Sequence, residues 1–447
     1  MKHLFSRNSI VLLLCILTGI VFFFRYGKEY NILHGDALGY YSYLPSAFIY
    51  HNFTSIEVLP EHKNIPGDIR EYFHRNLSEN KRSPKGYYIN QYTYGIALME
   101  LPFFAIAHSI EWLRGGEANG YSLLYKNMIR FSGFMYLLIG LLLLYDVLRK
   151  YFRDRSSMGC IALLLIGTNL FWFTFFQGGM AHIPLFFLYA LLIYLSQQLY
   201  QNTRSIHFFL VSLVCGLITV IRPSDVLCIL IPLLFGIRSV NDGITRIQFI
   251  KNHVRQGLPV ALGFILPILP QLIFWKMYAG SFLYDSYVNQ SFDFRHPKII
   301  EGLFGFSNGW LAYTPLMFFA LFGMLRYKKT GAIFLPLLII LPLYVYIIYS
   351  WFCYTYINGL GSRPMIHMYP LLAFPLAASL EYIAERSIWI RSIAWFIISF
   401  FVFINLSYSI HAATGDLRSE QSNYVYNLGI LFKKNLNYQD LVVLDVE

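Results

Sequence analysis

Hydrophobic residues dominate long runs of this chain, and polar residues interrupt those runs only at short intervals. A helix needs about 20 consecutive apolar residues to cross the hydrocarbon core of a bilayer, and many of the runs approach that length. A soluble fold has no use for so many of them, because its helices carry an apolar stripe on one face only. The pattern therefore predicts an all-α polytopic membrane protein with about eleven transmembrane helices. We expect these spans at about residues 9–24, 126–148, 157–177, 183–200, 208–221, 224–237, 257–279, 309–325, 330–350, 364–384 and 388–410.

The apolar segment over residues 94–113 is expected to lie in the membrane interface, or to re-enter, rather than to cross. It contains Glu100, His108 and Glu111, and a charged side chain at the bilayer centre costs roughly 2.5–3.5 kcal/mol. A long first external loop then covers residues 25–125 and carries interfacial helices. We expect residues 1–410 to form one transmembrane domain and residues 411–447 to form a short external tail.

Composition agrees with a membrane protein. Hydrophobic residues make up 56% of the chain and charged residues only 13%, against roughly 25% charged residues in a soluble protein. The net charge of +11 is not typical of nucleic-acid binding here, because the basic residues stand in short loops between the apolar runs, where they set orientation. The cysteines form no CxxC pair, so neither a disulfide framework nor a zinc site is indicated.

Basic loops predict the orientation. Clusters of Lys and Arg occur at residues 149–155, 238–255, 326–329 and 386–391. All four fall on the side of the N-terminus in the eleven-span scheme, which places them in the cytoplasm of a cell with an inner membrane. The other ionisable residues gather at the external ends of the spans, and none stands near the middle of one. A coupled transporter keeps carboxylates near the midplane, so the pattern favours chemistry at the external face.

The first external loop holds two candidate groups. Asp36 follows His34 and Gly35 just past the first span, and it can serve either as the N-cap of a helix or as a general base at the membrane surface. Lys85 precedes a run of tyrosines. It can bind lipid headgroups beside an aromatic interface belt, or it can bind a phosphate.

Two later segments add candidate anion ligands. Arg222 stands in a tight Pro-containing turn with Asp225 three residues on, where it either snorkels to headgroups or binds an anion. Arg363 follows a glycine-rich stretch that is either a flexible turn or a place where backbone approaches a ligand closely. His182 is a single external histidine, for which a structural role is the more common one.

In their order, these segments resemble the GT-C superfamily of polyprenyl-phosphate-dependent glycosyltransferases, and within it bacterial enzymes similar to protein O-mannosyltransferases and to the aminoarabinose transferase of lipid A. Residues 90–104 look like the Asn-Lys-Tyr-Pro-x-Gly-x-x-Leu-x-x-x-Pro-Phe pattern of bacterial members. The resemblance implies that Asp36 is the catalytic base and that Lys85, Arg222 and Arg363 bind the donor phosphate. The chain departs from the family pattern in having Asp36-Ala37 instead of Asp-Glu, and Gln91 where many relatives have Lys. Lys85 and Arg222 therefore both stay open as the main phosphate ligand.

The function expected from the resemblance is inverting transfer of a sugar from a polyprenyl-phosphate donor to a hydroxyl of a lipid, polysaccharide or protein acceptor at the periplasmic face. Membrane lipids are the other expected partners, and nucleic acid is not one. We expect no cofactor, because cations on the leaving phosphate make a metal unnecessary, although a divalent metal stays an open alternative. Two other functions also stay open: a flippase or transporter for lipid-linked sugars, and an O-antigen ligase or polymerase with a pyrophosphate-linked donor. Further candidate substrate-binding residues are Tyr40, Tyr88, Asn90, His182, Asp225, Asp293 and His367.

Overall fold

The computed structural model describes residues 32–53, 65–71, 82–287, 290–326, 331–356, 359–417 and 422–432. In these ranges the regular elements are helices, apart from one isolated bridge between Phe292 and Trp351. The prediction of an all-α protein is therefore confirmed. The α-helices are α2 (Gly35–Tyr41), α3 (Tyr43–Phe48), α5 (Gly95–Arg114), α6 (Leu123–Leu148), α7 (Asp154–Ile166), α8 (Leu170–Phe175), α9 (His182–Gln201), α10 (Ser205–Ile221), α11 (Leu230–Leu234), α12 (Val240–Asn252), α13 (Gly257–Ile265), α14 (Leu269–Tyr278), α15 (Ile299–Phe304), α16 (Trp310–Tyr313), α17 (Met317–Met324), α19 (Phe334–Tyr349), α20 (Tyr369–Ala384), α21 (Ile388–Thr414) and α22 (Tyr424–Ile430). The 3₁₀ helices are η2 (Pro223–Ile229), η3 (Val254–Gln256), η4 (Gly331–Ile333) and η5 (Arg363–Met368).

The number of candidate spans is lower than the sequence predicts. Five helices of the described chain are long and apolar enough to cross a membrane, and a bent pair makes up to six. The five are α5, α6, α9, the combined Gly331–Tyr349 helix and α21, and the pair joins Val254–Ile265 to Leu269–Tyr278 at an angle of 51°. Several long apolar helices still indicate a multi-pass membrane protein. The predicted first span, residues 9–24, lies outside the described residues.

Short helices explain the difference, and in most of the affected spans a break makes the helix short. Five predicted spans, residues 157–177, 208–221, 224–237, 309–325 and 364–384, hold helices too short to pass this length test. The longest of them, α10, has 17 residues, and α7 has 13, which at a rise of 1.5 Å per residue gives α7 a length of about 20 Å. The breaks fall where polar residues or prolines interrupt the helix, as at Thr314-Pro315.

The helix α5 covers the segment predicted to be interfacial. By length and composition it is a candidate span, and it packs along the first half of α6 and against α2, α3 and α10. The Tyr136 hydroxyl donates to the Met99 carbonyl at 2.6 Å, and the His108 Nδ1 lies 2.6 Å from the Tyr125 hydroxyl. The helix ends at Gly115, which has a φ of +63°, a conformation that suits glycine at a helix C-terminus.

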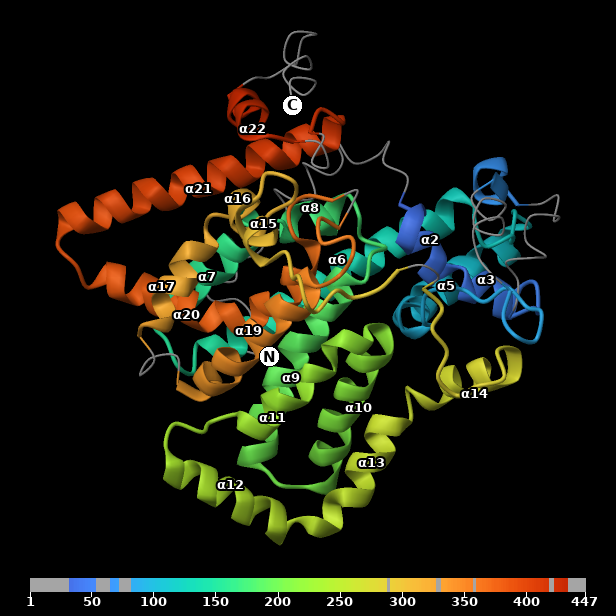
Figure 1. The fold of residues 1–447 in the computed structure, drawn as a ribbon, viewed down its shortest axis with the longest axis horizontal. Helices are drawn as coiled ribbons and strands as arrows, with labels where there is room; N and C mark the ends of the chain where they lie inside the picture. The colour runs from blue at the N-terminus through green and yellow to red at the C-terminus, as the bar shows by residue number, and fades with distance from the viewer. Residues whose placement is uncertain are drawn as a thin grey trace.

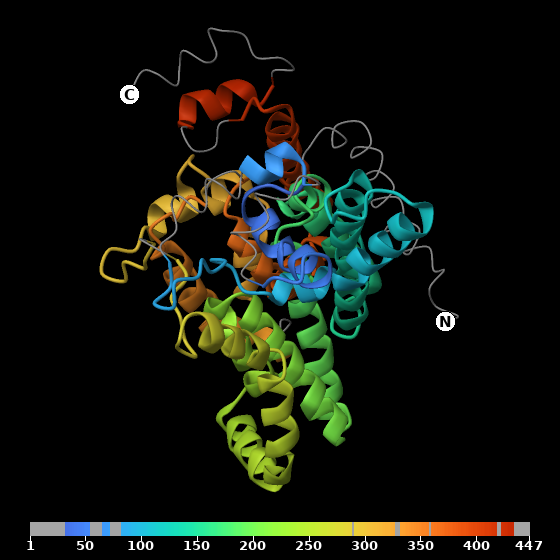
Figure 2. The same ribbon diagram turned by 90° about the vertical axis from the view of Figure 1, so that its right-hand side faces the viewer.

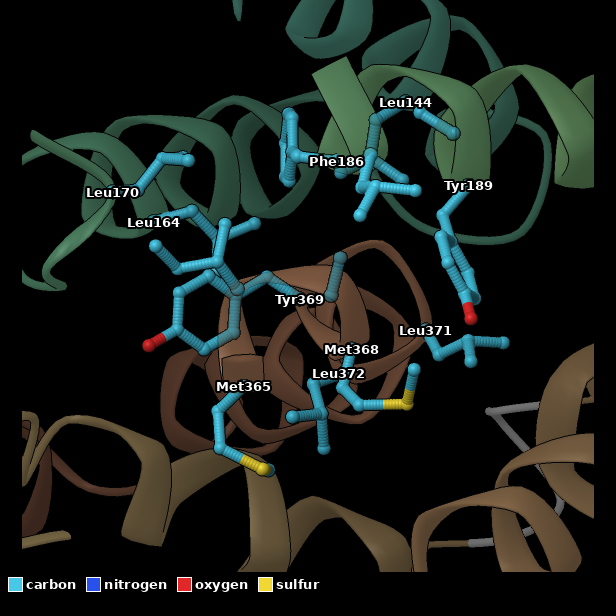
Figure 3. Packing of buried hydrophobic residues seen from close by; sticks show 14 of the residues in the cluster. Leu144, Leu164, Leu170, Phe186, Tyr189, Met365, Met368, Tyr369, Leu371 and Leu372 are labelled. Atoms are coloured by element: carbon cyan, nitrogen blue, oxygen red, sulfur yellow. The ribbon is translucent and has the colours of Figure 1, made fainter. Parts of the chain in front are cut away.

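A core of large side chains joins the middle helices. Figure 3 shows this core, which includes Leu144 of α6, Phe186 and Tyr189 of α9, and Tyr369 of α20. All four side chains are fully buried. Small residues let the backbones approach at the edges of this core. A Cβ atom on Gly133 of α6 would lie only 2.7 Å from the Gly178 carbonyl oxygen, so the segment that leads into α9 is held against α6.

Two basic clusters meet at the C-terminal end of α9. The Lys150 ammonium donates to the Gln197 side chain at 2.8 Å. The Arg246 guanidinium lies 3.7 Å from the ring centre of Tyr200 and donates to the carbonyls that end α11. These contacts bring residues of the 149–155 and 238–255 clusters to the same end of the bundle.

The other two basic clusters lie at the C-terminal end of α20. There the ring of Tyr382 and the carboxylate of Glu381 contact the basic residues. Arg326 and Arg386 lie 4.5 and 3.9 Å from the Tyr382 ring centre, and the backbone N–H of Arg153 donates to Glu381 at 2.5 Å. Because Arg153 belongs to the same cluster as Lys150, all four clusters share one end of the molecule. We call it the basic end.

The views agree with these contacts. In Figure 1 α12 lies at the bottom, across the ends of α9, α10 and α13, whereas α2, α3 and α5 lie on the right, away from it. Figure 2, turned by 90°, shows α2 near the middle of the molecule, α12 below and α22 above. The helices α9 and α20 thus run from the region of α2 to the basic end.

Candidate functional site

A cavity of about 820 Å³ opens at the end of the bundle opposite the basic end. Its walls come from segments that are distant in the sequence: α2, residues 91–93, 177–182, 221–224, 284–287, 290–294 and 347–356, and the first residue of η5. Of the predicted site residues, it is lined by Asp36, Tyr40, His182, Arg222 and Arg363.

Asp36 lies in the first turn of α2, inside the helix. The N-cap position belongs to His34, whose side chain makes no capping hydrogen bond, so the alternative of an Asp N-cap is wrong. One carboxylate oxygen of Asp36 accepts a hydrogen bond from Arg363 at 2.9 Å, and the other accepts one from the Tyr92 hydroxyl at 2.7 Å. The side chains of Asp36 and Arg363 remain 28% and 15% exposed, so this ion pair borders the cavity and is not sealed in the core.

Arg222 closes the C-terminus of α10 and enters the same cavity. Its Nε donates to the Ser224 hydroxyl at 3.2 Å and lies 3.7 Å from the Asp225 carboxylate, while an Nη donates to the Tyr356 hydroxyl at 3.4 Å. Tyr356 therefore holds the outer part of the guanidinium and Asp225 the inner part.

The ring of Tyr356 lies near both guanidinium groups. Their carbon atoms are 5.6 Å (Arg222) and 5.9 Å (Arg363) from the ring centre, within the range of cation–π attraction. Tyr356 adopts a φ of +49°, which is uncommon for a residue other than glycine. Burial raises the pKa of Tyr356 to about 12 against the opposing effect of Arg222 and Arg363, so its hydroxyl stays protonated and neutral at pH 7.

The cavity also has acidic and neutral polar walls. Asp285 lines it alongside Asp36, so two carboxylates and two guanidinium groups share this space. Burial lowers the pKa of the His34 imidazole, with Asp36 raising it and Arg363 lowering it. His34 is therefore neutral at pH 7, and the positive charges at the site are those of the two arginines.

Behind Arg222 the polar side chains continue into the core. The Asp225 carboxylate accepts a hydrogen bond from the His367 Nδ1 at 2.8 Å, and the His367 Nε2 lies 2.9 Å from the Nδ1 of His182. Asp225 and His367 are 0% exposed and His182 is 3% exposed. The structure thus brings together three residues that the sequence places far apart.

The remaining predicted site residues lie elsewhere. The Lys85 ammonium donates to the Met277 and Lys276 carbonyls at the end of α14, and Lys85 is not among the residues that line the cavity. Tyr88 packs beneath the Arg82 guanidinium at 4.4 Å. Asp293 is in an exposed loop, where it accepts hydrogen bonds from the backbone and from His296. These three residues do not join the Asp36 site.

Asn90 supports the site without lining the cavity. Its side chain donates to the Gly39 carbonyl at 2.8 Å and accepts from the Tyr92 N–H at 3.1 Å. Asn90 therefore fixes Tyr92 relative to α2, and Tyr92 in turn donates to Asp36.

Sequence reasoning missed Tyr92 and Tyr356 as site residues. Tyr92 stands in a run of tyrosines that is typical of an interface belt, and nothing in that run distinguishes the tyrosine that contacts the carboxylate. Tyr356 carries no local signal either. Among the described residues no group of three or more His, Cys, Asp or Glu side chains could hold a metal ion.

Comparison of the chain with models of protein families, with curated proteins and with solved structures found no match.

Proposed function

We propose that this protein is a membrane glycosyltransferase that moves a sugar from a polyprenyl-phosphate donor to an acceptor hydroxyl. The observation that carries the proposal is the pairing of Asp36 with Arg363 at 2.9 Å in a cavity whose wall also holds Arg222. Such a site offers a carboxylate that can take up a proton next to two cations that can bind a phosphate. The GT-C resemblance of the sequence agrees with this chemistry.

In the proposed reaction Asp36 accepts the proton of the acceptor hydroxyl as its oxygen attacks the anomeric carbon, with inversion. The bond between that carbon and the phosphate oxygen breaks, and the polyprenyl phosphate leaves with its negative charge. Arg222 and Arg363 stabilise this charge, and guanidinium groups suit phosphate because they donate in a fixed fork. The lipid tail of the donor lies among the apolar helices.

The polarity of the molecule supports an external active site. His182 at the start of α9 lines the cavity, whereas the basic clusters meet at the other end of that helix. The helix has 20 residues and is about 30 Å long, close to the thickness of a hydrocarbon core. Since basic loops stay in the cytoplasm, the cavity faces the periplasmic side of the inner membrane. This orientation of the cavity does not depend on the number of spans.

The test is transfer of radiolabelled sugar from undecaprenyl-phosphate hexoses in proteoliposomes, by wild type and by Asp36→Asn. We expect wild type to release undecaprenyl phosphate and form a glycosylated product, and Asp36→Asn to lose at least about 100-fold in rate, as expected for removal of a general base. The amide oxygen can still accept the hydrogen bond from Arg363, and the amide NH2 can donate to the Tyr92 hydroxyl, so the variant should fold.

The matched control is Asp146→Asn. Asp146 is also partly exposed and also paired with an arginine, Arg149, at 2.8 Å, but it lies at the basic end. The control should transfer at the wild-type rate. Normal turnover by Asp36→Asn would disprove the role of this carboxylate, and movement of labelled lipid without a covalent product would replace the transferase with a flippase.

A further inference from the structure

The buried chain of Asp225, His367 and His182 connects the cavity to the core. Around it, the Tyr189 and Ser224 hydroxyls donate to the Asp225 carboxylate, both at 3.3 Å. The Tyr344 hydroxyl donates to the Pro364 carbonyl at 3.0 Å and lies 2.8 Å from the His367 Nδ1. Each polar side-chain atom of Asp225, His367 and His182 therefore has a partner among the described residues, apart from the Nε2 of His182.

The carboxylate fixes which nitrogen of each histidine carries the proton. A carboxylate only accepts hydrogen bonds, and Asp225 lies 3.7 Å from Arg222 and 2.8 Å from the His367 Nδ1, so this nitrogen is the donor. In a neutral His367 the Nε2 is then bare and accepts a hydrogen bond from the Nδ1 of His182. A neutral His182 that donates from Nδ1 keeps a lone pair on Nε2.

This lone pair belongs to the cavity wall. His182 is among the lining residues, and its Nε2 has no hydrogen-bond partner in the described part of the chain. The segment that carries His182 also touches α2, because a Cβ atom on Gly179 would lie 3.3 Å from that of Ala37, the neighbour of Asp36. The bare nitrogen and the Asp36 carboxylate thus belong to adjoining parts of one cavity.

We propose that the Nε2 of His182 is the hydrogen-bond acceptor for one hydroxyl group of the transferred sugar, held in that role by His367 and Asp225. The proposal rests on the proposed function, whose site it refines. A bare ring nitrogen repels a phosphate oxygen and accepts a hydrogen bond from a hydroxyl. The phosphate therefore binds at Arg222 and Arg363 and the sugar ring binds toward His182. His367 and Asp225 act through His182 and are positioning residues.

Deoxy donors test this contact. Undecaprenyl-phosphate hexoses that each lack one hydroxyl are compared with the parent donor by their kcat/KM. A site built to bind a hydroxyl rejects the analogue that lacks it, because a polar group of the protein is then left unpaired. We expect wild type to prefer the parent over one of the analogues by at least about 100-fold, and over the others by much less.

The variant His182→Asn removes the acceptor nitrogen and keeps a hydrogen-bond donor toward His367. The Asn side-chain amide can still donate to the His367 Nε2 in place of the Nδ1, but it has no atom at the position of Nε2. We expect the preference at that one hydroxyl to fall to less than about threefold, through loss of activity on the parent donor. His296→Asn is the control, since His296 also pairs with an aspartate, at 3.1 Å, but is exposed and lies outside the cavity.

The variant Asp225→Asn tests the positioning role. An amide in place of the carboxylate donates to the His367 Nδ1 and so reverses both tautomers, which turns the His182 Nε2 into an N–H donor. We expect the same loss of preference as in His182→Asn, although the His182 side chain is intact. A role limited to packing would leave the ratio between the donors unchanged.

Nitrogen NMR of protein labelled with ¹⁵N-histidine separates this proposal from the function itself. We expect the His182 Nε2, assigned by its absence in His182→Asn, to be unprotonated at neutral pH in wild type and protonated in Asp225→Asn. A protonated Nε2 in wild type, or an unchanged preference in His182→Asn, would overturn the proposal. Absence of transfer by wild type from every donor would overturn the proposed function, and with it the assignment of a sugar hydroxyl, while the NMR result would still decide the tautomer.

Discussion

At the scale of single residues, the cavity brings the Asp36 carboxylate together with the guanidinium groups of Arg222 and Arg363. Asp36, Arg222 and Arg363 can be named from the sequence because charge next to an apolar run is expensive and therefore informative. Their neighbours cannot be named in this way. Tyr356 contacts both arginines through its ring, but the chain holds 35 tyrosines and no local pattern separates this one from those in the interface belt.

Replacement of the two arginines and replacement of Lys85 should affect binding of the donor phosphate differently. Arg222→Gln and Arg363→Gln should each lower kcat/KM for transfer by about 100-fold, because in the proposed reaction each removes a charged contact to the leaving phosphate. Lys85→Gln should leave transfer within about threefold of wild type, since its ammonium is bound to carbonyls of α14. A loss with Lys85→Gln as large as with Arg222→Gln would restore the sequence-based assignment of Lys85 as a phosphate ligand.

At the scale of elements, helix ends carry the site and helix crossings hold those ends in place. Arg222 directly follows α10, and α10 packs closely against α13. A Cβ atom on Gly263 would lie 3.1 Å from the Leu213 backbone nitrogen, and one on Gly216 would overlap the Phe264 carbonyl. Such close crossings of membrane helices require small residues. Sequence reasoning found both helices but not their contact, which involves single glycines.

A larger side chain at this crossing should disturb the site from a distance. We expect Gly216→Leu to lower the thermal unfolding temperature in detergent and to weaken transfer, because overpacking costs about 1–3 kcal/mol and displaces the end of α10. Gly243→Leu in α12 is the control, since nothing lies within 4 Å of a Cβ atom at that position. Equal unfolding temperatures for both variants and wild type would contradict the close packing of α10 against α13 at Gly216.

At the scale of the whole molecule, the basic clusters lie together at one end, as expected, although the predicted number of spans is wrong. Eleven spans were expected, and five or six candidates are found in the described chain. The grouping of the four basic clusters nevertheless agrees with the contacts at the ends of α9 and α20. Loop charge is a property of composition and can be read from a sequence, whereas the points where helices break depend on packing.

Cysteine labelling tests this separation. In a cysteine-free background, Arg149→Cys, Lys251→Cys and Arg386→Cys should react with a membrane-impermeant maleimide only after permeabilisation of the cells, because all three belong to the basic end. Leu283→Cys, at the cavity end and 77% exposed, should react in intact cells. Labelling of any of the first three positions in intact cells would contradict a single cytoplasmic end.

The ion pair between Asp36 and Arg363 joins residues 327 positions apart. A chain made from its N-terminus at about 5–20 residues per second inserts Asp36 roughly 16–65 s before Arg363. Throughout that interval the carboxylate has no guanidinium partner and the cavity lacks a wall. Under the proposed function, a chain that has not yet reached Arg363 can therefore occupy the membrane but cannot consume donor lipid.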